Sequence, residues 1–278
     1  MKYEERIKML LENGPAVSLE EPELVICGGG HVSLELSVLA DYLEYTYTVI
    51  DDRTEFASRE RFPRAKECIC QPFGEVLKTR QFSANAYYII VTRGHAHDLE
   101  CLELILQKSY GYVGMIGSRS KVRLVMDTLE AKGFSKEQLS EVHAPIGLPI
   151  GGETPKEVAV SIISQLIQVR NKEQSGSYLD HAMKEQLKSE EPMVMVTIIE
   201  KKGSAPRGVG SRMLVGKNGI LCGTVGGGTI EYEAVKEAMA MVGTTDSMTK
   251  WYRLDSDSAA SLGMWCGGQL HLLFQGVI

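Results

Sequence analysis

Several features that would mark a membrane, secreted or disulfide-rich protein are missing from the sequence. No apolar run approaches the ~20 residues that a membrane-spanning helix needs. No apolar stretch follows the charged segment 1–6, so we expect no signal peptide. The six cysteines include no Cys-x-x-Cys pair and do not form a disulfide scaffold in a chain of 278 residues. The sequence therefore predicts a cytoplasmic protein with reduced thiols and no membrane partner.

Positive charge and aromatic residues are also scarce. The 36 Asp and Glu residues outnumber the 30 Lys and Arg residues, so with a net charge of −6 the chain as a whole lacks the excess of positive charge that is typical of a nucleic-acid-binding protein, and we expect no nucleic-acid partner. Aromatic residues make up only 7%, whereas 44% apolar and 24% charged residues are ordinary values for a globular protein. Glycine is in excess, because the 28 glycines make up ~10% of the 278 residues, compared with the usual ~7%. This excess indicates either flexible linkers or places where the backbone comes close to a ligand.

Short apolar runs alternate with helical spacings in the first part of the chain. We expect strands over 24–27, 46–50, 67–70, 87–92 and 111–116, and helices over 32–43, 98–108, 120–132 and 155–170. Thr154, Pro155 and Glu157 form a capping box at the start of the last helix. Strands that alternate with helices predict an α/β fold with a Rossmann-like, doubly wound parallel sheet.

A second pattern begins after the polar residues 173–191, which we interpret as a linker with some helix. The Asn218-Gly219 pair predicts a tight hairpin. Strand runs at 193–200, 211–215, 220–225, 249–254 and 269–275 surround a helix over 230–241. We therefore expect a Rossmann-like nucleotide-binding domain over 1–172, which includes an N-terminal helix, and a smaller α+β glycine-rich domain over 192–278.

A glycine turn follows the first strand and opens the next helix. Gly28 and Gly30 suit the tight turn and the close backbone approach of a pyrophosphate, although Ser33 stands where a third glycine or alanine is usual. Asp51 ends the second strand, where an acidic side chain can accept hydrogen bonds from a ribose. His31 lies inside the turn, and it either contacts the cofactor or caps and packs the helix. This pattern predicts a nucleotide-binding turn.

Ordered motifs over nearly all of residues 22–278 resemble the XdhC/CoxI family of xanthine dehydrogenase accessory factors. The motifs similar to its Rossmann segment include 27–32 (Cys-Gly-Gly-Gly-His-Val), 49–53 (Val-Ile-Asp-Asp-Arg), 60–63 (Glu-Arg-Phe-Pro), 91–95 (Val-Thr-Arg-Gly-His), 112–119 (Tyr-Val-Gly-Met-Ile-Gly-Ser-Arg) and 152–157 (Gly-Glu-Thr-Pro-Lys-Glu). Those similar to its other segment include 203–207 (Gly-Ser-Ala-Pro-Arg), 223–231 (Gly-Thr-Val-Gly-Gly-Gly-Thr-Ile-Glu) and 266–268 (Cys-Gly-Gly). The two segments stand in the reverse of the family's usual order.

The resemblance implies a cofactor-binding maturation chaperone rather than an enzyme with turnover. Such a factor binds molybdenum cofactor, as molybdopterin in mono- or dinucleotide form, and assists its sulfuration and insertion into an apo molybdenum hydroxylase of the xanthine dehydrogenase type. A cysteine desulfurase is a further implied partner, and we expect a homo-oligomer. The alternative function is an NAD(P)-dependent oxidoreductase that uses the glycine turn, with His95 or His97 as its acid or base.

Two more strand ends carry candidate ligand contacts. His95 follows a strand at the edge where open α/β sheets bind ligands, and Arg119 follows the next strand and can contact an anion. A metal site at His95, His97 and Asp98 is the alternative that we favour less, and we assign no metal ligand. We therefore expect His95 and Arg119 near the bound cofactor.

The glycine-rich domain offers a second anion-binding loop directly before its helix. Arg207 and Arg212 are expected to contact phosphate beside an anion nest formed by Gly226, Gly227 and Gly228. Glu231 either binds the amino-pyrimidine edge of a pterin or is a favourable charge at a helix N-terminus. Cys266 either carries sulfur or ligates molybdenum, or it is a packing cysteine.

Overall fold

The computed structural model describes residues 2–12, 22–173, 179–253 and 268–278. The chain divides into two compact units. Residues 21–172 form one, which we call the Rossmann unit, and residues 1–20 together with 173–278 form the other, which we call the glycine-rich unit. No helix among the described residues has the length and apolar character that crossing a membrane requires.

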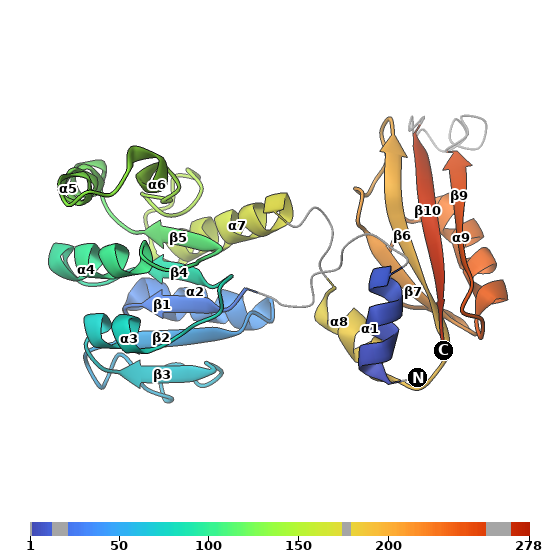
Figure 1. Cartoon of the computed structure of the whole chain (residues 1–278), viewed down its shortest axis with the longest axis horizontal. Coiled ribbons are helices and arrows are strands. Elements are labelled where there is room, and N and C mark those ends of the chain that lie inside the picture. The colour runs from blue at the N-terminus through green and yellow to red at the C-terminus, as the bar shows by residue number, and fades with distance from the viewer. Residues whose placement is uncertain (1, 13–21, 174–178, 254–267) are drawn as a thin grey trace. The chain divides into compact units, whose positions relative to one another are not determined.

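The Rossmann unit is built on a five-stranded parallel sheet (Figure 1). Its strands are β1 (Leu24–Cys27), β2 (Tyr47–Asp51), β3 (Glu67–Cys70), β4 (Tyr87–Ile90) and β5 (Tyr112–Met115). They follow the order β3-β2-β1-β4-β5. Every residue of β1, β2, β4 and β5 is buried, as expected for a sheet that is covered on both faces. This confirms the predicted fold class. The strand order reverses between β1 and β4, which is the point where open α/β sheets commonly bind ligands.

Helices cover both faces of this sheet. The helices α2 (His31–Tyr42) and α7 (Pro155–Glu173) pack on one face. The other face is covered by α3 (Phe73–Thr79), α4 (His95–Ile105), α5 (Arg119–Ala131) and α6 (Lys136–Ser140). The predicted capping box is present, because Glu157 accepts from the Thr154 amide (2.9 Å) and the Glu157 amide donates to the Thr154 hydroxyl (3.3 Å). The short α3, with its apolar Phe73, Val76 and Leu77, was not predicted.

The glycine-rich unit contains a five-stranded antiparallel sheet of order β8-β7-β6-β10-β9. The strands are β6 (Met193–Lys202), β7 (Arg212–Gly216), β8 (Gly219–Gly223), β9 (Ser247–Arg253) and β10 (Gln269–Val277). The predicted hairpin joins β7 to β8, and Gly219 has the positive φ of 119° that such a turn needs. The helix α9 (Gly228–Met241) packs on one face of the sheet, and α1 (Tyr3–Glu12) and α8 (His181–Lys188) pack on the other.

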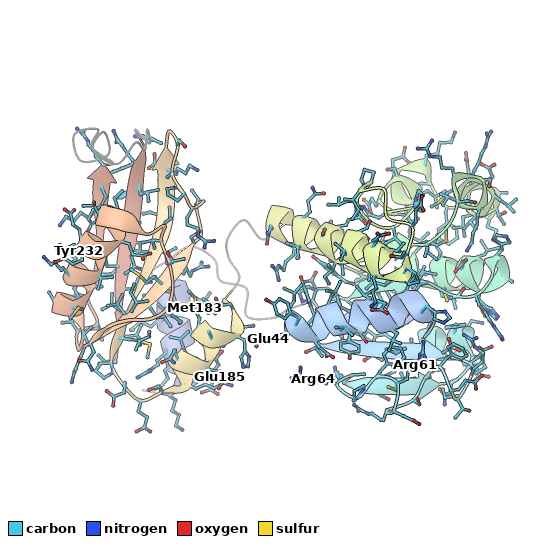
Figure 2. All side chains as sticks on the ribbon, turned by 180° about the vertical axis from the view of Figure 1, so that it is seen from behind. Glu44, Arg61, Arg64, Met183, Glu185 and Tyr232 are labelled. Atoms are coloured by element: carbon cyan, nitrogen blue, oxygen red, sulfur yellow. The ribbon has the colours of Figure 1, made fainter. Side chains whose placement is uncertain are left out.

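The placement of α1 and α8 corrects the predicted division of the chain. Ile7 and Leu10 of α1 are buried against Met183 and Leu187 of α8, so the N-terminal helix belongs to the glycine-rich unit and not to the Rossmann unit. Met183 faces this core while Glu185 is exposed (Figure 2). The polar segment 173–191, which we interpreted as a linker with some helix, contains α8, and two apolar residues four positions apart are enough to anchor it.

Arg6 joins these elements to the end of the chain. It is fully buried, and its guanidinium donates to the carbonyl oxygens of Leu187, Ser189 and Glu191 and to that of Ile278. The carbonyls of Leu187, Ser189 and Glu191 end α8 or follow it, so they lack partners within the helix. Burial lowers the pKa of Arg6, and the four carbonyl oxygens compensate the buried charge. One side chain thus connects α1, α8 and β10.

We expect Arg6→Met to lower the free energy of unfolding of the glycine-rich unit by about 2–4 kcal/mol, because buried carbonyls lose a charged donor. Amide hydrogen exchange of the full chain, followed by mass spectrometry, should show faster exchange in α1 and α8. Arg123→Met, on an exposed part of α5, is the control and should change exchange little. Wild-type protection of α8 in Arg6→Met would show that this contact is dispensable.

Candidate functional site

The turn between β1 and α2 requires glycine at two positions for steric reasons. Gly28 has φ 108°, and a Cβ there would lie 2.5 Å from the carbonyl oxygen of Val91. A Cβ on Gly29 would lie 1.9 Å from the carbonyl oxygen of Phe56. The turn is therefore enclosed between the end of β4 and the segment that follows β2.

Asp51, at the end of β2, holds this turn by a hydrogen bond to its backbone. Its buried carboxylate accepts from the Gly29 amide (2.8 Å) and from the Arg53 guanidinium (2.8 and 2.9 Å) and amide (3.1 Å). Burial raises the pKa of Asp51, but the hydrogen bonds from Arg53 and Gly29 outweigh it and lower the pKa overall. Both carboxylate oxygens have protein partners, so Asp51 positions the loop, and the predicted bond to a ribose would have to displace one of them. The role of Arg53 was not predicted.

Arg61, from the segment after β2, holds the same turn through its carbonyl oxygens. Its guanidinium donates to the carbonyl oxygens of Gly29 (2.8 Å) and Gly30 (3.2 Å). In a trans peptide the N–H points opposite to the C=O, so the Gly30 and His31 amides point away from the Arg61 guanidinium. Ser33 is buried and its hydroxyl donates to the Gly28 carbonyl, so it closes the turn instead of facing a ligand.

Gly30 marks the open side of the turn. Its φ of −70° and ψ of −163° are available to any residue, and a Cβ there would meet no atom within 4 Å. The next residue, His31, is exposed and begins α2. The first amides of a helix lack partners within it and lie at the positive end of its dipole. The turn therefore offers an unobstructed approach to an anionic group.

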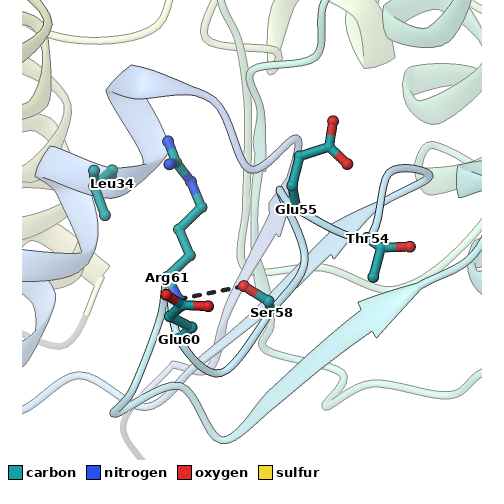
Figure 3. A pocket seen from close by; sticks show the side chains of 6 residues that line it. All are labelled: Leu34, Thr54, Glu55, Ser58, Glu60 and Arg61. Carbon is teal, nitrogen blue, oxygen red and sulfur yellow. Dashed lines mark hydrogen bonds between the residues drawn. The ribbon is translucent and has the colours of Figure 1, made fainter.

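A hollow of about 710 Å³ lies beside the turn. Its lining comes from α2 and from the segment after β2, and consists of Leu34, Thr54, Glu55, Ser58, Glu60 and Arg61 (Figure 3). The size lies within the range of small-molecule sites. Because Arg61 both lines the hollow and holds the turn, the hollow and the open amides of α2 form one candidate site. The Glu-Arg-Phe-Pro motif at 60–63 was the sequence signal for it.

The ends of β4 and β5 complete this edge of the sheet. His95 and Arg119 are exposed and begin α4 and α5. The structure thus brings both to the edge that carries Gly30 and His31, as parallel strands require. Arg93 extends across this edge to Asp52, with its guanidinium 3.5 Å from the carboxylate.

Asp98, which we considered as a metal ligand or helix cap, has an internal role. It is completely buried, and it accepts from the Thr92 hydroxyl (2.6 Å) and pairs with the Lys121 ammonium group. A Cβ on Gly117 would lie 3.0 Å from the Lys121 side chain, so the chain passes close to this lysine. The described residues contain no group of three His, Cys, Asp or Glu side chains able to hold a metal ion.

The glycine-rich loop before α9 differs from the predicted anion nest. Gly226, Gly227 and Gly228 have φ of 131°, 74° and 67°, so all three need glycine. However, the carboxylate of Glu231 accepts from the Gly227 amide (3.2 Å), from the Val225 amide (3.0 Å) and from the Thr224 hydroxyl. A protein carboxylate therefore occupies the position where we expected a ligand anion, and this loop is closed by its own helix.

The two arginines that we predicted beside this loop differ in their exposure to solvent. Arg207 is exposed, and its Cγ would lie 3.7 Å from a Cβ on Gly226, so it adjoins the loop as predicted. Arg212 is buried, donates to the Gly210 carbonyl (3.3 Å), and has its pKa lowered to about 10 by burial. Only Arg207 is thus accessible to a phosphate. Cys266 lies outside the described residues.

We expect Glu231→Gln to remove a pH-dependent part of the stability of the glycine-rich unit. Burial raises the pKa of Glu231, but the hydrogen bonds from Thr224 and the loop amides outweigh it and lower the pKa overall. Its contribution is therefore complete above the unfolded-state pKa of about 4.3 and is lost as the pH falls through the lower folded-state value. Chemical denaturation between pH 7 and pH 3 measures this.

The control is Glu233→Gln, on an exposed residue of the same helix. At pH 7 the Glu231 variant should be the less stable of the two, and its stability should fall less than that of the wild type in acid. Parallel curves for Glu231→Gln and wild type would contradict a role for the ionised carboxylate.

Comparisons with known proteins agree with this architecture. The chain is 31% identical over 156 residues to the uncharacterized protein YqeB of Escherichia coli, covering 56% of this chain and 28% of that one. It is 26% identical over 152 residues to a Bacillus subtilis protein described as a probable component of xanthine dehydrogenase, covering 55% and 44%. Over 60 residues it is 42% identical to the molybdenum cofactor insertion chaperone PaoD of Escherichia coli, covering 22% and 19%. The chain thus spans less than half the length of these relatives.

A crystal structure of a xanthine dehydrogenase from Bacillus halodurans matches with a TM-score of 0.51 and 27% identity, covering 56% of this chain and 45% of that one. Residues 24–166 match the family model described as the XdhC Rossmann domain, and residues 186–252 match that of the XdhC and CoxI family. These matches cover most of both units, with the Rossmann segment first. The chain therefore belongs to the XdhC and CoxI family.

Proposed function

We propose that this protein binds molybdenum cofactor and assists its sulfuration and insertion into an apo molybdenum hydroxylase of the xanthine dehydrogenase type. Two relatives support this, one named as a probable component of xanthine dehydrogenase and the other as a molybdenum cofactor insertion chaperone. Together with the family they support a role in xanthine dehydrogenase maturation. We further propose that it acts in the cytoplasm as a homo-oligomer, with a cysteine desulfurase as a second partner.

The open β1–α2 turn is the observation that carries the proposal. Molybdenum cofactor has a phosphate or, in its dinucleotide form, a pyrophosphate. The Gly30 and His31 amides would hold this group, because they start α2 and the space at the Cβ position of Gly30 is open. The hollow beside Arg61 has room for an adjoining part of the molecule. When bound, the cofactor supplies the molybdenum centre that the client enzyme needs.

Other residues at this edge would orient the bound molecule. His31, His95 and Arg119 are all exposed there and offer hydrogen-bond donors to an anionic group. Sulfuration needs a sulfur-carrying group, and Cys266 remains our proposed carrier or molybdenum ligand. Its thiol chemistry would be tested by Cys266→Ala, which should retain cofactor binding but reduce activation of the client.

An NAD(P)-dependent oxidoreductase is the alternative function. It depends on Asp51 as the ribose acceptor, yet this carboxylate already accepts four hydrogen bonds from Gly29 and Arg53. His95 and His97 are on α4, and the imidazole Nδ1 of His97 lies 4.0 Å from the carboxylate of Glu100. The geometry therefore supports cofactor handling better than hydride transfer.

Gly30→Val tests the proposal, because the backbone at Gly30 accepts a side chain and only an incoming ligand would meet it. We expect only a small loss of stability, since valine is a poorer N-cap residue than glycine, and a loss of at least about tenfold in affinity for isolated molybdenum cofactor. Equilibrium binding should be measured by calorimetry with the mono- and dinucleotide forms, and NAD(H) should be titrated in parallel.

Ala131→Val adds a branched side chain at the exposed end of α5 and serves as the control. It should bind the cofactor like the wild type. The proposed function fails if the wild-type protein binds neither form of the cofactor. The assignment of the turn fails if Gly30→Val binds as tightly as Ala131→Val.

A further inference from the structure

Trp251 and His271 form a stacked pair on the sheet of the glycine-rich unit. Trp251 lies on the edge strand β9 and His271 on its neighbour β10, directly opposite in the strand register. The ring centroids are 4.5 Å apart and the planes differ by 11°. In spite of this stacking, 37% of the Trp251 surface remains exposed. A large aromatic side chain is thus held in a fixed orientation while part of it faces solvent.

Charged side chains surround this pair. The ammonium group of Lys202 lies 4.5 Å from the centre of the Trp251 ring. Glu200 approaches both Lys202 (3.7 Å) and the His271 Nδ1 (3.7 Å), so one carboxylate adjoins the lysine and the imidazole. The exposed Arg253 follows two residues after Trp251 on the same strand. A rigid aromatic surface with cations at its border favours a flat ligand with negative charge.

A comparison within the same chain shows that packing alone does not explain this arrangement. Tyr112 and His143 in the Rossmann unit also stack, with centroids 4.7 Å apart and planes at 19°. That tyrosine is only 2% exposed, and its hydroxyl donates to Gln165 at 2.6 Å. It is a part of the core, whereas Trp251 stacks at the surface of the sheet in a chain that has few aromatic residues.

The position of the pair connects it to the glycine-rich loops. It lies near the end of the sheet where β6 leads into the segment that carries Arg207, and where β10 begins after Gly268. A Cβ on Gly268 would lie 2.0 Å from the Ser204 carbonyl oxygen, so these two segments are in contact. The aromatic pair, Arg207 and Lys202 therefore belong to one end of this unit.

From these observations we propose that Trp251 and His271 form a binding platform for a planar heteroaromatic ring that carries a negative charge. The Lys202 ammonium group, which lies 4.5 Å from the centre of the indole ring, would contact the negative charge of the ligand. The inference extends the proposed function, since a pterin and a nucleobase are the flat groups of molybdenum cofactor. It rests on that function only for the identity of the physiological ligand.

Fluorescence of a single-tryptophan protein tests the platform directly. The chain has two tryptophans, so Trp265→Phe leaves Trp251 as the reporter. We expect pterin-6-carboxylate to quench its emission with a saturable curve, and uncharged pterin to bind more weakly. Lys202→Gln should reduce the affinity for pterin-6-carboxylate towards that for pterin. If quenching does not saturate, or if Lys202→Gln leaves the preference for the charged compound unchanged, the proposal is wrong.

Calorimetry with the full chain completes the test. Trp251→Leu should weaken binding of pterin-6-carboxylate at least about fivefold, because stacking on the indole is lost. Trp251→Phe should retain most of the affinity, and circular dichroism establishes that both variants fold. The matched control is Tyr232→Leu, since Tyr232 is an exposed aromatic residue of the same unit (Figure 2) with the Lys236 ammonium 4.4 Å from its ring but no stacked histidine.

The outcomes separate this inference from the proposed function. If wild type and Trp251→Leu bind isolated molybdenum cofactor and pterin-6-carboxylate equally well, the platform is excluded and the proposed function stands. If the single-tryptophan protein binds pterin-6-carboxylate but the wild type does not bind molybdenum cofactor, the platform stands and the proposed function fails. Equal losses in Trp251→Leu and Tyr232→Leu would show that no specific platform exists.

Discussion

The hydrogen bond from the Gly29 amide to the buried carboxylate of Asp51 is the constraint on which the candidate site depends. It draws one peptide of the β1–α2 turn towards β2, while Arg61 holds the next carbonyls from the opposite side. The two contacts together fix the peptide planes and leave the Gly30 and His31 amides facing outwards. Arg53 neutralises Asp51 and stacks its guanidinium 3.6 Å above the Phe56 ring, so the charge that organises the turn is itself compensated.

Both units of the chain order a glycine loop with a carboxylate, but with opposite results. Asp51 accepts from only one amide of its glycine turn, that of Gly29, and leaves the start of α2 open, whereas Glu231 accepts from the Val225 and Gly227 amides of the loop before α9. A second anion at those amides would have to displace Glu231, and its ionised form is favoured by the same hydrogen bonds. Under the proposed function, this difference favours the Rossmann unit as the place for a phosphate group and leaves Arg207 and the exposed aromatic pair for other parts of the ligand.

The sequence predicted the strands, most helices and the Rossmann topology, because apolar periodicity and capping residues are local signals. It also correctly indicated the edge of the sheet, at the carboxyl ends of the strands, where Gly30, His31, His95 and Arg119 lie. The contacts of Arg6, Arg53 and Arg61 could not be predicted, since an arginine that binds backbone carbonyls or an aspartate leaves no periodic pattern. For the same reason Asp51 was interpreted as a ligand contact, although its partners are Gly29 and Arg53. The segment that contains α8 was interpreted as a linker with some helix, because the two buried apolar residues of α8, Met183 and Leu187, lie within a polar segment.

The distribution of glycine shows why composition and position have to be considered together. Gly28 and Gly29 are needed because other backbone atoms approach them, and Gly226 to Gly228 are needed because their φ values are positive. Gly30 meets neither condition, since its backbone angles suit any residue and nothing lies near a Cβ. Gly30 is the N-cap of α2, where glycine is favoured over alanine or valine, but several polar residues would serve there equally well. A ligand that lies against the backbone would require glycine at this position, and Gly30 is therefore the residue that most directly supports a binding role.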